Sequence, residues 1–310
     1  MSTRVAAIDC GTNSIRLLVT DLDPQAGTSG ELLRRMEIVR LGQGVDATGR
    51  LAPEALQRTF AACDDYAARI RELGAERIRF VATSATRDAS NRDEFFEGIR
   101  ARFGVEPEVI TGDQEAALSF AGATGSVAGD PAGHPTPYLV VDIGGGSTEF
   151  VLGAGSVEAA RSVDIGCVRL TERHLTQDPP TAAQIAAARR DVDAAIDLAA
   201  ELVPVGQAKT LVGVAGSVTT VAAVALGLER YDPARVHLSR ISAETVRQVA
   251  GDLLASTRAL RAANPVIHPG RVDVIGAGAL ILAQIMDRLG LSEVVVSEHD
   301  ILDGIALSQV

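Results

Sequence analysis

The sequence predicts an α/β protein built from two related domains, and the main indication is a duplicated motif. Residues 8–19 read IDCGTNSIRLLV and residues 141–152 read VDIGGGSTEFVL. In each copy an apolar run ends in an aspartate, a turn of small residues follows, and a second apolar run returns, which is typical of a β-hairpin. After each hairpin, helical and strand periodicity alternate, as they do in α/β layers. A length of 310 residues is also typical of two domains.

The first half predicts three strands followed by alternating helices and strands. Pro53 suits the first turn of the first helix, because proline at this position loses no helical hydrogen bond. The expected elements are strands within 4–22 and at 31–41 on either side of a turn at 24–30, a helix at 54–73, a strand from 77 that runs into a Ser/Thr-rich loop at 83–89, a helix at 92–103, a strand at 106–110 and a helix at 113–121.

A segment rich in Gly and Pro at 125–137 is the predicted domain boundary, which gives domains of about 1–127 and 136–299. The second half then repeats the order of the first. Its expected elements are the hairpin at 138–153, a strand within 156–170, a helix at 181–202, a buried strand that enters a helix through Gly213 and Gly216, a strand at 293–297 and a short helix at 300–310.

Composition excludes several classes of protein. The net charge is −11, and Lys209 is the single lysine beside 28 arginines, so neither broad nucleic-acid binding nor a Gly-Lys-Ser/Thr phosphate loop is expected. No apolar run reaches the about 18–20 residues that span a membrane, and no signal peptide is recognisable. Three scattered cysteines suit a reducing cytoplasm, which is the expected location.

The turn of the second hairpin is the strongest candidate for phosphate binding. Gly144, Gly145 and Gly146 let the backbone approach a ligand closely, and their N–H groups with those of Ser147 and Thr148 can form an anion-binding nest. An ordinary hairpin turn needs at most two glycines. The equivalent turn in the first hairpin consists of Gly11, Thr12, Asn13 and Ser14.

Carboxylates beside these turns indicate a metal ion. Asp142 and Glu149 flank the second turn, and Asp9 occupies the equivalent position beside the first. Carboxylates next to a bound phosphate would repel it unless a cation lies between them. The expected cofactor is Mg²⁺, with Mn²⁺ as an alternative.

Two further candidates, Glu115 and Arg87, leave alternatives open. Glu115 follows a strand at the start of a helix, where it could act in catalysis or simply occupy the first turn behind an Asp113 cap. Arg87 follows another strand, where it could bind phosphate in a bidentate manner or pair with Asp88 or Asp93 at the surface.

Cys10 and Arg16 match the Cys-x5-Arg spacing of cysteine-dependent phosphatases. Those enzymes need a thiolate stabilised at a helix N-terminus. Here Asp9 adjoins the cysteine and would oppose its ionisation, and the residues after Arg16 alternate as a strand does. A thiolate mechanism is therefore not expected.

Eight motifs in order resemble the exopolyphosphatase/guanosine pentaphosphate phosphohydrolase family, a branch of the actin-like ATPase and sugar-kinase superfamily. They read IDCGTNSIRLL, VATSATRDASN, ITGDQEAAL, VVDIGGGSTEF, SVDIGCVRLTE, VGVAGSVTTVAAV, RVDVIGAGALIL and VVVSEHDILDGIAL, and they cover nearly the whole chain. The resemblance implies two ribonuclease-H-like domains with an interdomain cleft, and a final helix that packs back on the first domain.

The resemblance also implies roles for individual residues. Glu115 falls on the family's general base, with Arg87 beside the phosphate chain, and Asp142, Glu149 and Asp9 fall on or near its metal site. The residues expected to bind or line the phosphate chain are Gly11, Thr12, Asn13, Ser14, Arg16, Gly144, Gly145, Gly146, Ser147, Cys167, Gly216 and Ser217.

The implied activity is hydrolytic release of terminal orthophosphate from inorganic polyphosphate. The chain matches only the first two domains of long family members, which implies short-chain substrates and a homodimer that supplies extra surface. The alternative substrate is guanosine pentaphosphate (pppGpp), for which no base-stacking platform is evident among three Tyr, seven Phe and no Trp. An ATP-dependent actin-like kinase and a non-catalytic sensor of polyphosphate or (p)ppGpp are further alternatives.

Overall fold

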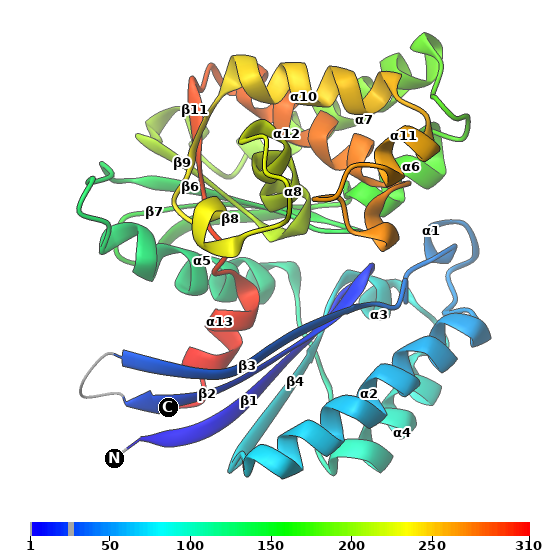
Figure 1. Cartoon of the computed structure of the whole chain (residues 1–310), viewed down its shortest axis with the longest axis vertical. Coiled ribbons are helices and arrows are strands. Elements are labelled where there is room, and N and C mark those ends of the chain that lie inside the picture. Colours follow the sequence, from blue (N-terminus) through cyan, green and yellow to red (C-terminus); the bar gives the residue numbers. More distant parts are fainter. Residues whose placement is uncertain (1, 24–27) are drawn as a thin grey trace. The chain divides into compact units, whose positions relative to one another are not determined.

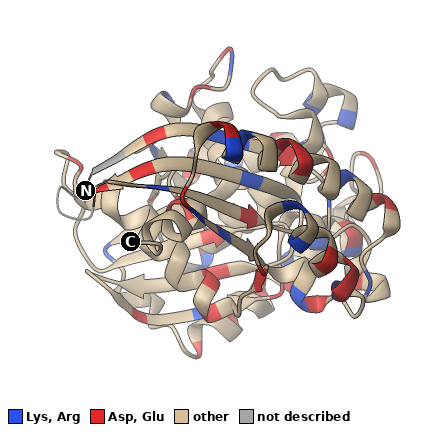
Figure 2. Ribbon diagram, turned by 90° about the horizontal axis from the view of Figure 1, so that it is seen from below, with Lys and Arg blue, Asp and Glu red and all other residues tan. Residues whose placement is uncertain are grey.

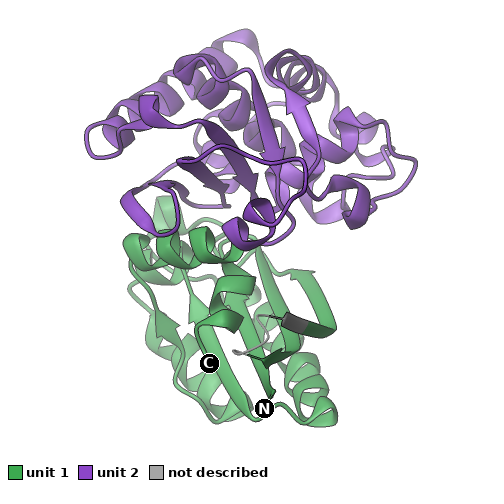
Figure 3. Cartoon of the chain, turned by 90° about the vertical axis from the view of Figure 1, so that its left-hand side faces the viewer, with its two compact units in different colours: residues 1–122, 301–310 green, residues 123–300 purple. Residues whose placement is uncertain are grey.

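The computed structural model describes residues 2–23 and 28–310, so most of the turn expected at 24–30 lies outside the described residues. The chain divides into two compact units (Figure 3): unit 1 comprises Met1–Gly122 and Ile301–Val310, and unit 2 comprises Ala123–Asp300. The division falls inside a helix rather than in the Gly- and Pro-rich segment at 125–137. That helix, α5 (Gly112–Ala128), continues through Gly122 and Gly125 because its alanine-rich turns keep their helical bonds.

Unit 1 is a five-stranded mixed sheet with helices on both faces (Figure 1). The sheet order is β3-β2-β1-β4-β5, in which β1, β2 and β3 are antiparallel and β1, β4 and β5 are parallel. The strands are β1 (Thr3–Cys10), β2 (Ser14–Asp23), β3 (Thr28–Ile38), β4 (Arg77–Ala82) and β5 (Glu108–Val109). The helices are α1 (Val45–Thr48), α2 (Pro53–Leu73), α3 (Ser84–Asp88), α4 (Arg92–Phe103), the first part of α5, and α13 (Ile301–Leu307).

Alternation along β1 explains how this sheet is covered on both faces. Ile8 and Cys10 point to a core that α2 and α4 complete, whereas Val5 and Ala7 point to a second core that α13 completes. The final helix thus packs on the sheet of unit 1, although it follows the whole of unit 2 in sequence (Figure 1).

Unit 2 repeats the strand order of unit 1. Its sheet order is β10-β11-β9-β6-β7-β8, so β8-β7-β6-β9-β11 corresponds to β3-β2-β1-β4-β5 with one strand added at the edge. The strands are β6 (Tyr138–Ile143), β7 (Thr148–Gly153), β8 (Val157–Val163), β9 (Thr210–Val214), β10 (Arg240–Ser242) and β11 (Glu293–Val296). This repetition confirms the α/β fold of two related domains.

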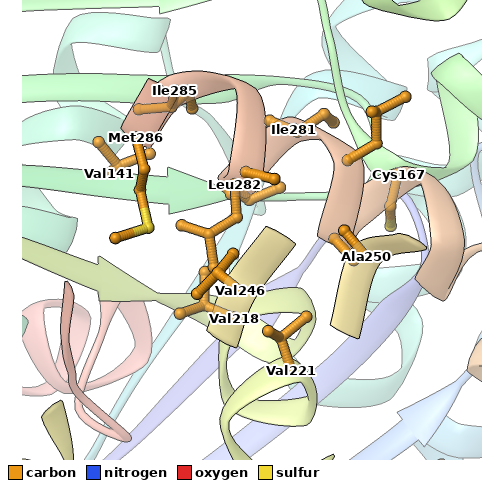
Figure 4. Packing of buried hydrophobic residues seen from close by; sticks show 14 of the residues in the cluster. Val141, Cys167, Val218, Val221, Val246, Ala250, Ile281, Leu282, Ile285 and Met286 are labelled. Atoms are coloured by element: carbon orange, nitrogen blue, oxygen red, sulfur yellow. The ribbon is translucent and has the colours of Figure 1, made fainter. Parts of the chain in front are cut away.

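The helices of unit 2 enclose one large apolar core (Figure 4). In it, Val141 of the sheet lies with Val218, Val246, Ile281 and Met286 of three helices. The helices are the end of α5, α6 (Cys167–His174), α7 (Ala182–Ala200), η1 (Val205–Gln207), α8 (Ala215–Ala225), α9 (Pro233–Val236), α10 (Ala243–Ala255), α11 (Arg258–Ala262), η2 (Pro269–Arg271) and α12 (Ile275–Leu289).

Two of the differences from the predicted elements are short helices that other segments start. Residues 84–88 form α3 rather than a loop, because Thr86 and Arg87 donate their N–H groups back to the Thr83 carbonyl at 3.1 and 3.0 Å. Residues 167–170 begin α6 rather than end a strand, since backbone contacts to the preceding hairpin turn start the helix there. Helices this short depend on tertiary contacts that periodicity does not reveal.

The packing of α13 predicts a sensitive glycine. A Cβ on Gly304 would lie 2.0 Å from the backbone oxygen of Leu118 in α5. Gly304→Ala should therefore lower the free energy of unfolding by about 1–3 kcal/mol through overpacking. Gly251→Ala is the matched control, because no atom lies within 4 Å of that added methyl, and it should raise stability by about 0.4–1 kcal/mol. Urea unfolding measures both; equal effects of the two variants would contradict this packing.

Candidate functional site

The predicted residues of unit 1 gather where its parallel strands end. Because β1, β4 and β5 are parallel, their carboxyl ends meet at one edge of the sheet. The hairpin turn 11–14, α3 and the start of α5 follow these three ends. The Thr83 N–H donates to the Cys10 carbonyl and the Ile110 N–H to the Ala82 carbonyl, both at 3.2 Å, and these bonds fix the following segments at that edge.

The turn of the first hairpin is oriented by the loop after β3. Gly11 closes the turn with an N–H bond of 2.9 Å to the Ser14 carbonyl, while Gly42 donates to the Thr12 carbonyl and Arg40 to the Asn13 carbonyl, both at 2.9 Å. In a trans peptide the C=O and the following N–H point in opposite directions. The N–H groups of Asn13 and Ser14 are therefore directed away from this loop.

Two polar side chains in this turn have unused hydrogen-bonding capacity. Thr12 Oγ1 and Asn13 Oδ1 are buried and have no hydrogen-bond partner within the described part of the chain. Most buried polar atoms in folded proteins are paired, so such atoms at a turn suit a ligand. The Thr12 hydroxyl can donate to a phosphate oxygen, which agrees with the role expected for the turn, whereas Asn13 Oδ1 can only accept a hydrogen bond.

Asp9 is paired with Arg16 across the hairpin. The two residues are register partners in β1 and β2, and Asp9 Oδ2 accepts bonds from Arg16 Nη2 at 2.7 Å and Nε at 3.0 Å. The carboxylate is 5% exposed. The guanidinium balances this buried charge, so unit 1 offers less to a cation here than the sequence suggested.

Glu115 and Arg87, which the sequence treated separately, form one pair. Arg87 Nη1 lies 3.2 Å from Glu115 Oε2 and donates to the Ile110 carbonyl at 2.8 Å. Pairing of Arg87 with Asp88 or Asp93 was thus the wrong alternative, because α3 turns its side chain toward α5. Capping by Asp113 was also the wrong alternative. Thr111 Oγ1 accepts the Gln114 N–H at 3.2 Å, and Gln114 Oε1 accepts the Thr111 N–H at 2.9 Å, which is a capping box.

In unit 2 the glycine turn is oriented by the first turn of α6. The Cys167 N–H donates to the Gly144 carbonyl at 3.0 Å, and the Val168 N–H donates to the Gly145 carbonyl at 2.9 Å. Arg169 Nε donates to the Gly146 carbonyl at 2.7 Å. By the same trans-peptide geometry, the N–H groups of residues 145, 146 and 147 all point away from α6. Three successive N–H groups on one side form a nest for a phosphate.

Gly166 allows this close contact between the turn and α6. A Cβ on Gly166 would lie 2.4 Å from the carbonyl carbon and oxygen of Gly145 and 2.6 Å from the backbone nitrogen of Gly146. Neither Gly166 nor Arg169 was singled out from the sequence, because the segment was assigned to a strand. A glycine directly before an amphipathic helical turn is the signal that could have indicated them.

Asp142 and Glu149 face each other across the second hairpin. They are register partners in β6 and β7, at 6% and 1% exposure, and Ser162 on β8 donates to Glu149 Oε1 at 2.7 Å. Like charges directly opposite each other in an antiparallel pair are destabilising. A divalent cation between the two carboxylates would reverse this effect.

The oxygen donors of this pair fit Mg²⁺. Within residues 2–23 and 28–310, no three His, Cys, Asp or Glu side chains form a group that could hold a metal ion. Mg²⁺ commonly binds through one or two carboxylates, with waters and substrate phosphates completing its octahedron. Asp142 and Glu149 suffice for such a site, whereas a site made only of protein ligands is not expected.

Cys167, Gly216 and Ser217 lie together at the starts of α6 and α8, beside an arginine that the sequence did not indicate. A Cβ on Gly216 would lie 1.4 Å from Arg271 Nη1, so the guanidinium occupies that space. Burial raises the pKa of the Cys167 thiol, while the Ser217 hydroxyl and Arg271 offset part of this shift. A cation on the first turn of α8 adds to the positive end of the helix dipole.

The glycine turn is distinct from a cavity of about 280 Å³ in the same unit. Its lining includes His134, Lys209, Arg240 and Glu293, which belong to the opposite edge of the sheet, where β9 and β11 begin. The Arg240–Glu293 ion pair neutralises part of its charge. The cavity therefore does not belong to the candidate phosphate site.

Both hairpins combine a buried aspartate with a turn whose N–H groups are oriented by a neighbouring segment, so this is an α/β protein with two candidate phosphate-binding turns. Residues 22–310 match the model of the Ppx/GppA phosphatase family. The chain belongs to this family, as its motifs predicted.

Known proteins resemble the chain over its whole length. Exopolyphosphatase 2 of Mycobacterium tuberculosis is 51% identical over 317 residues, which cover 99% of this chain and 98% of that protein. The crystal structure of an exopolyphosphatase-like protein matches with a TM-score of 0.96 at 47% identity, over 99% of this chain and 98% of that one. The PPX-GPPA enzyme of Aquifex aeolicus matches with a TM-score of 0.81 at 31% identity, over 99% and 100% of the two chains.

Membrane insertion through a helix finds no support in the structure. In the part of the chain that is described, every helix is too short or too polar to cross a bilayer.

Gly166 offers a direct test of the glycine turn. Gly166→Ala should displace the backbone of residues 145 and 146, because overpacking of this kind costs about 1–3 kcal/mol. If that cost falls on the transition state, kcat/KM for phosphate release should drop by about tenfold or more. Gly155→Ala is the control, because an added Cβ there meets no atom within 4 Å. A Gly166→Ala variant as active as the control would contradict the role assigned to this contact.

Cys10 tests the thiolate mechanism. Burial, and then the charges of Cys63 and Asp9, raise the pKa of the Cys10 thiol well above its ordinary value, so the thiol stays protonated at neutral pH. Cys10→Ala should therefore keep phosphate release within about threefold of the parent, since the thiolate is the nucleophilic form of cysteine. Loss of all turnover with an unchanged melting temperature would reinstate the thiolate mechanism.

Proposed function

We propose that this protein is a Mg²⁺-dependent exopolyphosphatase that releases terminal orthophosphate from inorganic polyphosphate. One observation carries the proposal: the hairpin of unit 2 combines three N–H groups on one side with two buried carboxylates in register. This arrangement suits a phosphate together with a divalent cation. The 51% identity to exopolyphosphatase 2 over 99% of the chain supports polyphosphate as the substrate.

The backbone turns would hold the phosphate chain. The N–H groups of residues 145–147 in unit 2 and of residues 13 and 14 in unit 1 are fixed by their neighbours before any substrate binds. Donors that are already oriented cost no reorganisation when charge develops on the transferring phosphoryl group. Asp142 and Glu149 would hold Mg²⁺, which when bound neutralises phosphate charge.

Glu115 would act as the general base. It would take a proton from the attacking water while the new P–O bond forms and the terminal phosphoanhydride bond breaks, so that orthophosphate leaves and the shortened chain keeps the bridging oxygen. The carboxylate is 8% exposed and lies in the first turn of α5. Arg87, at 3.2 Å, would hold it in one orientation.

Guanosine pentaphosphate is the second candidate substrate, and Tyr231 favours it. Its ring is 36% exposed, and its hydroxyl donates to Glu298 Oε1 at 2.5 Å. Burial and Glu298 raise the pKa of its hydroxyl, while Thr219 and the nearby Arg271 offset part of this shift. Tyr231 is thus an aromatic platform that composition alone did not reveal, and a guanine base could stack on it.

The central test compares the parent protein with Glu115→Gln on polyphosphates of increasing length and on guanosine pentaphosphate, with and without Mg²⁺. Glu115→Gln should lower kcat by about 10²–10⁴-fold, because the amide cannot accept the proton. Substrate binding should be nearly unchanged. Glu108→Gln is the control, since Glu108 pairs with Arg79 at the surface.

The outcomes separate the alternatives. Faster release from short polyphosphates than from long ones would agree with the chain-length preference expected from the sequence. A large excess of rate on guanosine pentaphosphate would make the nucleotide the substrate. Phosphate transfer from ATP to an acceptor would indicate a kinase, and binding without turnover would indicate a sensor. Use of Mn²⁺, homodimerisation and cytoplasmic location stay predictions of the sequence.

A further inference from the structure

We propose that Arg261 is a positioning residue that holds Arg271 on the first turn of α8 and so strengthens binding of the phosphate chain. The inference rests on the proposed function, because it takes the ligand near Arg271 to be a chain of phosphates. Arg261 itself would not touch that ligand.

Arg271 lies in a segment with little regular structure to hold it in place. The segment connects α11 to α12 and contains only the short 3₁₀ helix η2, where the Arg271 N–H donates to the His268 carbonyl at 2.8 Å. The Arg271 guanidinium nevertheless fills the space above Gly216. Ala215, just before this glycine, has a φ of 68°, which few residues with side chains adopt. Strained backbone of this kind tends to occur at functional sites.

Arg261 holds this segment in place through hydrogen bonds. It belongs to α11, and its Nε donates to the carbonyl of Val272, the residue next to Arg271, at 2.7 Å. Its Nη1 donates to the carbonyls of Leu253 and Ser256 at 3.1 and 2.6 Å. One guanidinium thus links the segment that carries Arg271 to the C-terminal end of α10.

The charge of Arg261 is also balanced. Its Nη2 lies 3.1 Å from Asp178 Oδ1, and the carboxylate of Asp178 accepts the Arg258 N–H at 2.8 and 2.9 Å. Arg261 is 8% exposed. All three of its guanidinium nitrogens bond to partners within unit 2. It acts on the site through Val272 rather than by contact with an anion.

Only arginine can make this set of bonds. Its planar fork directs donors to several partners at once, whereas the ammonium of lysine is a single point with a shorter reach. Arg261→Lys keeps the positive charge but loses the bond to Val272 or those to α10. The segment with Arg271 should then sample other positions, while the core of unit 2 stays intact.

The test is a double-mutant cycle on binding of tripolyphosphate, measured by calorimetry in the Glu115→Gln background so that the ligand is not consumed. Arg261→Lys should weaken binding by about tenfold when Arg271 is present, and by less than about twofold when Arg271 is replaced by alanine. Arg247→Lys is the matched control, because Arg247 pairs with Asp287 at the surface, and it should change nothing.

A second variant keeps the proposal falsifiable if Arg261→Lys does not fold. Asp178→Asn leaves all carbonyl partners of Arg261 in place and should weaken binding by about threefold, again only when Arg271 is present. Melting temperatures show which variants are folded. Equal losses of affinity with and without Arg271, or no loss in either variant, would overturn the proposal and leave Arg261 a structural residue.

The proposed function can fail separately. Coupled losses of tripolyphosphate binding together with no phosphate release by the parent protein would support the role of Arg261 and reject the exopolyphosphatase. Normal phosphate release together with additive effects of the Arg261 and Arg271 substitutions on binding would support the exopolyphosphatase and reject the role of Arg261.

Discussion

The residue that faces the aspartate across each hairpin determines what that hairpin can bind. Both hairpins close with the same N–H bond, from Gly11 to Ser14 and from Gly144 to Ser147, and both start a sheet of the same order. In unit 1 the residue facing the aspartate is an arginine, and in unit 2 it is a glutamate. One buried position thus carries an ion pair in one unit and two like charges in the other, although the backbone is the same.

Because of this difference, the two copies of the motif are suited to different ligands. In unit 1 the guanidinium neutralises the aspartate, and the turn can contribute N–H groups and the hydroxyl of Thr12. The carboxylates of unit 2 are like charges in register, and a cation between them would make them favourable neighbours. Local arrangement matters more here than total charge: the chain carries −11, and acidic and basic residues are interspersed along its ribbon (Figure 2). Fixed N–H groups and a metal act within a few ångströms, whereas charges farther away are screened by salt.

Much of the fold could be predicted from the sequence because the long elements have strong local signals. The helix at 92–103 was predicted with the bounds it has, and the two hairpins followed from their alternation and small-residue turns. The short helices α3 and α6 could not be predicted, because bonds to other segments start them. The pair of Arg87 and Glu115 could not be predicted either, because the two residues meet only after α3 and α5 are in place. Arg271 was missed because its importance depends on the absence of a side chain at Gly216.

The central claim is that the two facing carboxylates of unit 2 hold the metal, and the most direct measurement is the Mg²⁺ concentration that gives half-maximal phosphate release. In Glu149→Gln this concentration should rise by at least about tenfold, because a charged oxygen ligand is lost. In Asp9→Asn it should stay within about twofold of the parent, because Arg16 already balances that carboxylate. An unchanged Mg²⁺ requirement in Glu149→Gln, or a larger shift in Asp9→Asn, would contradict the account.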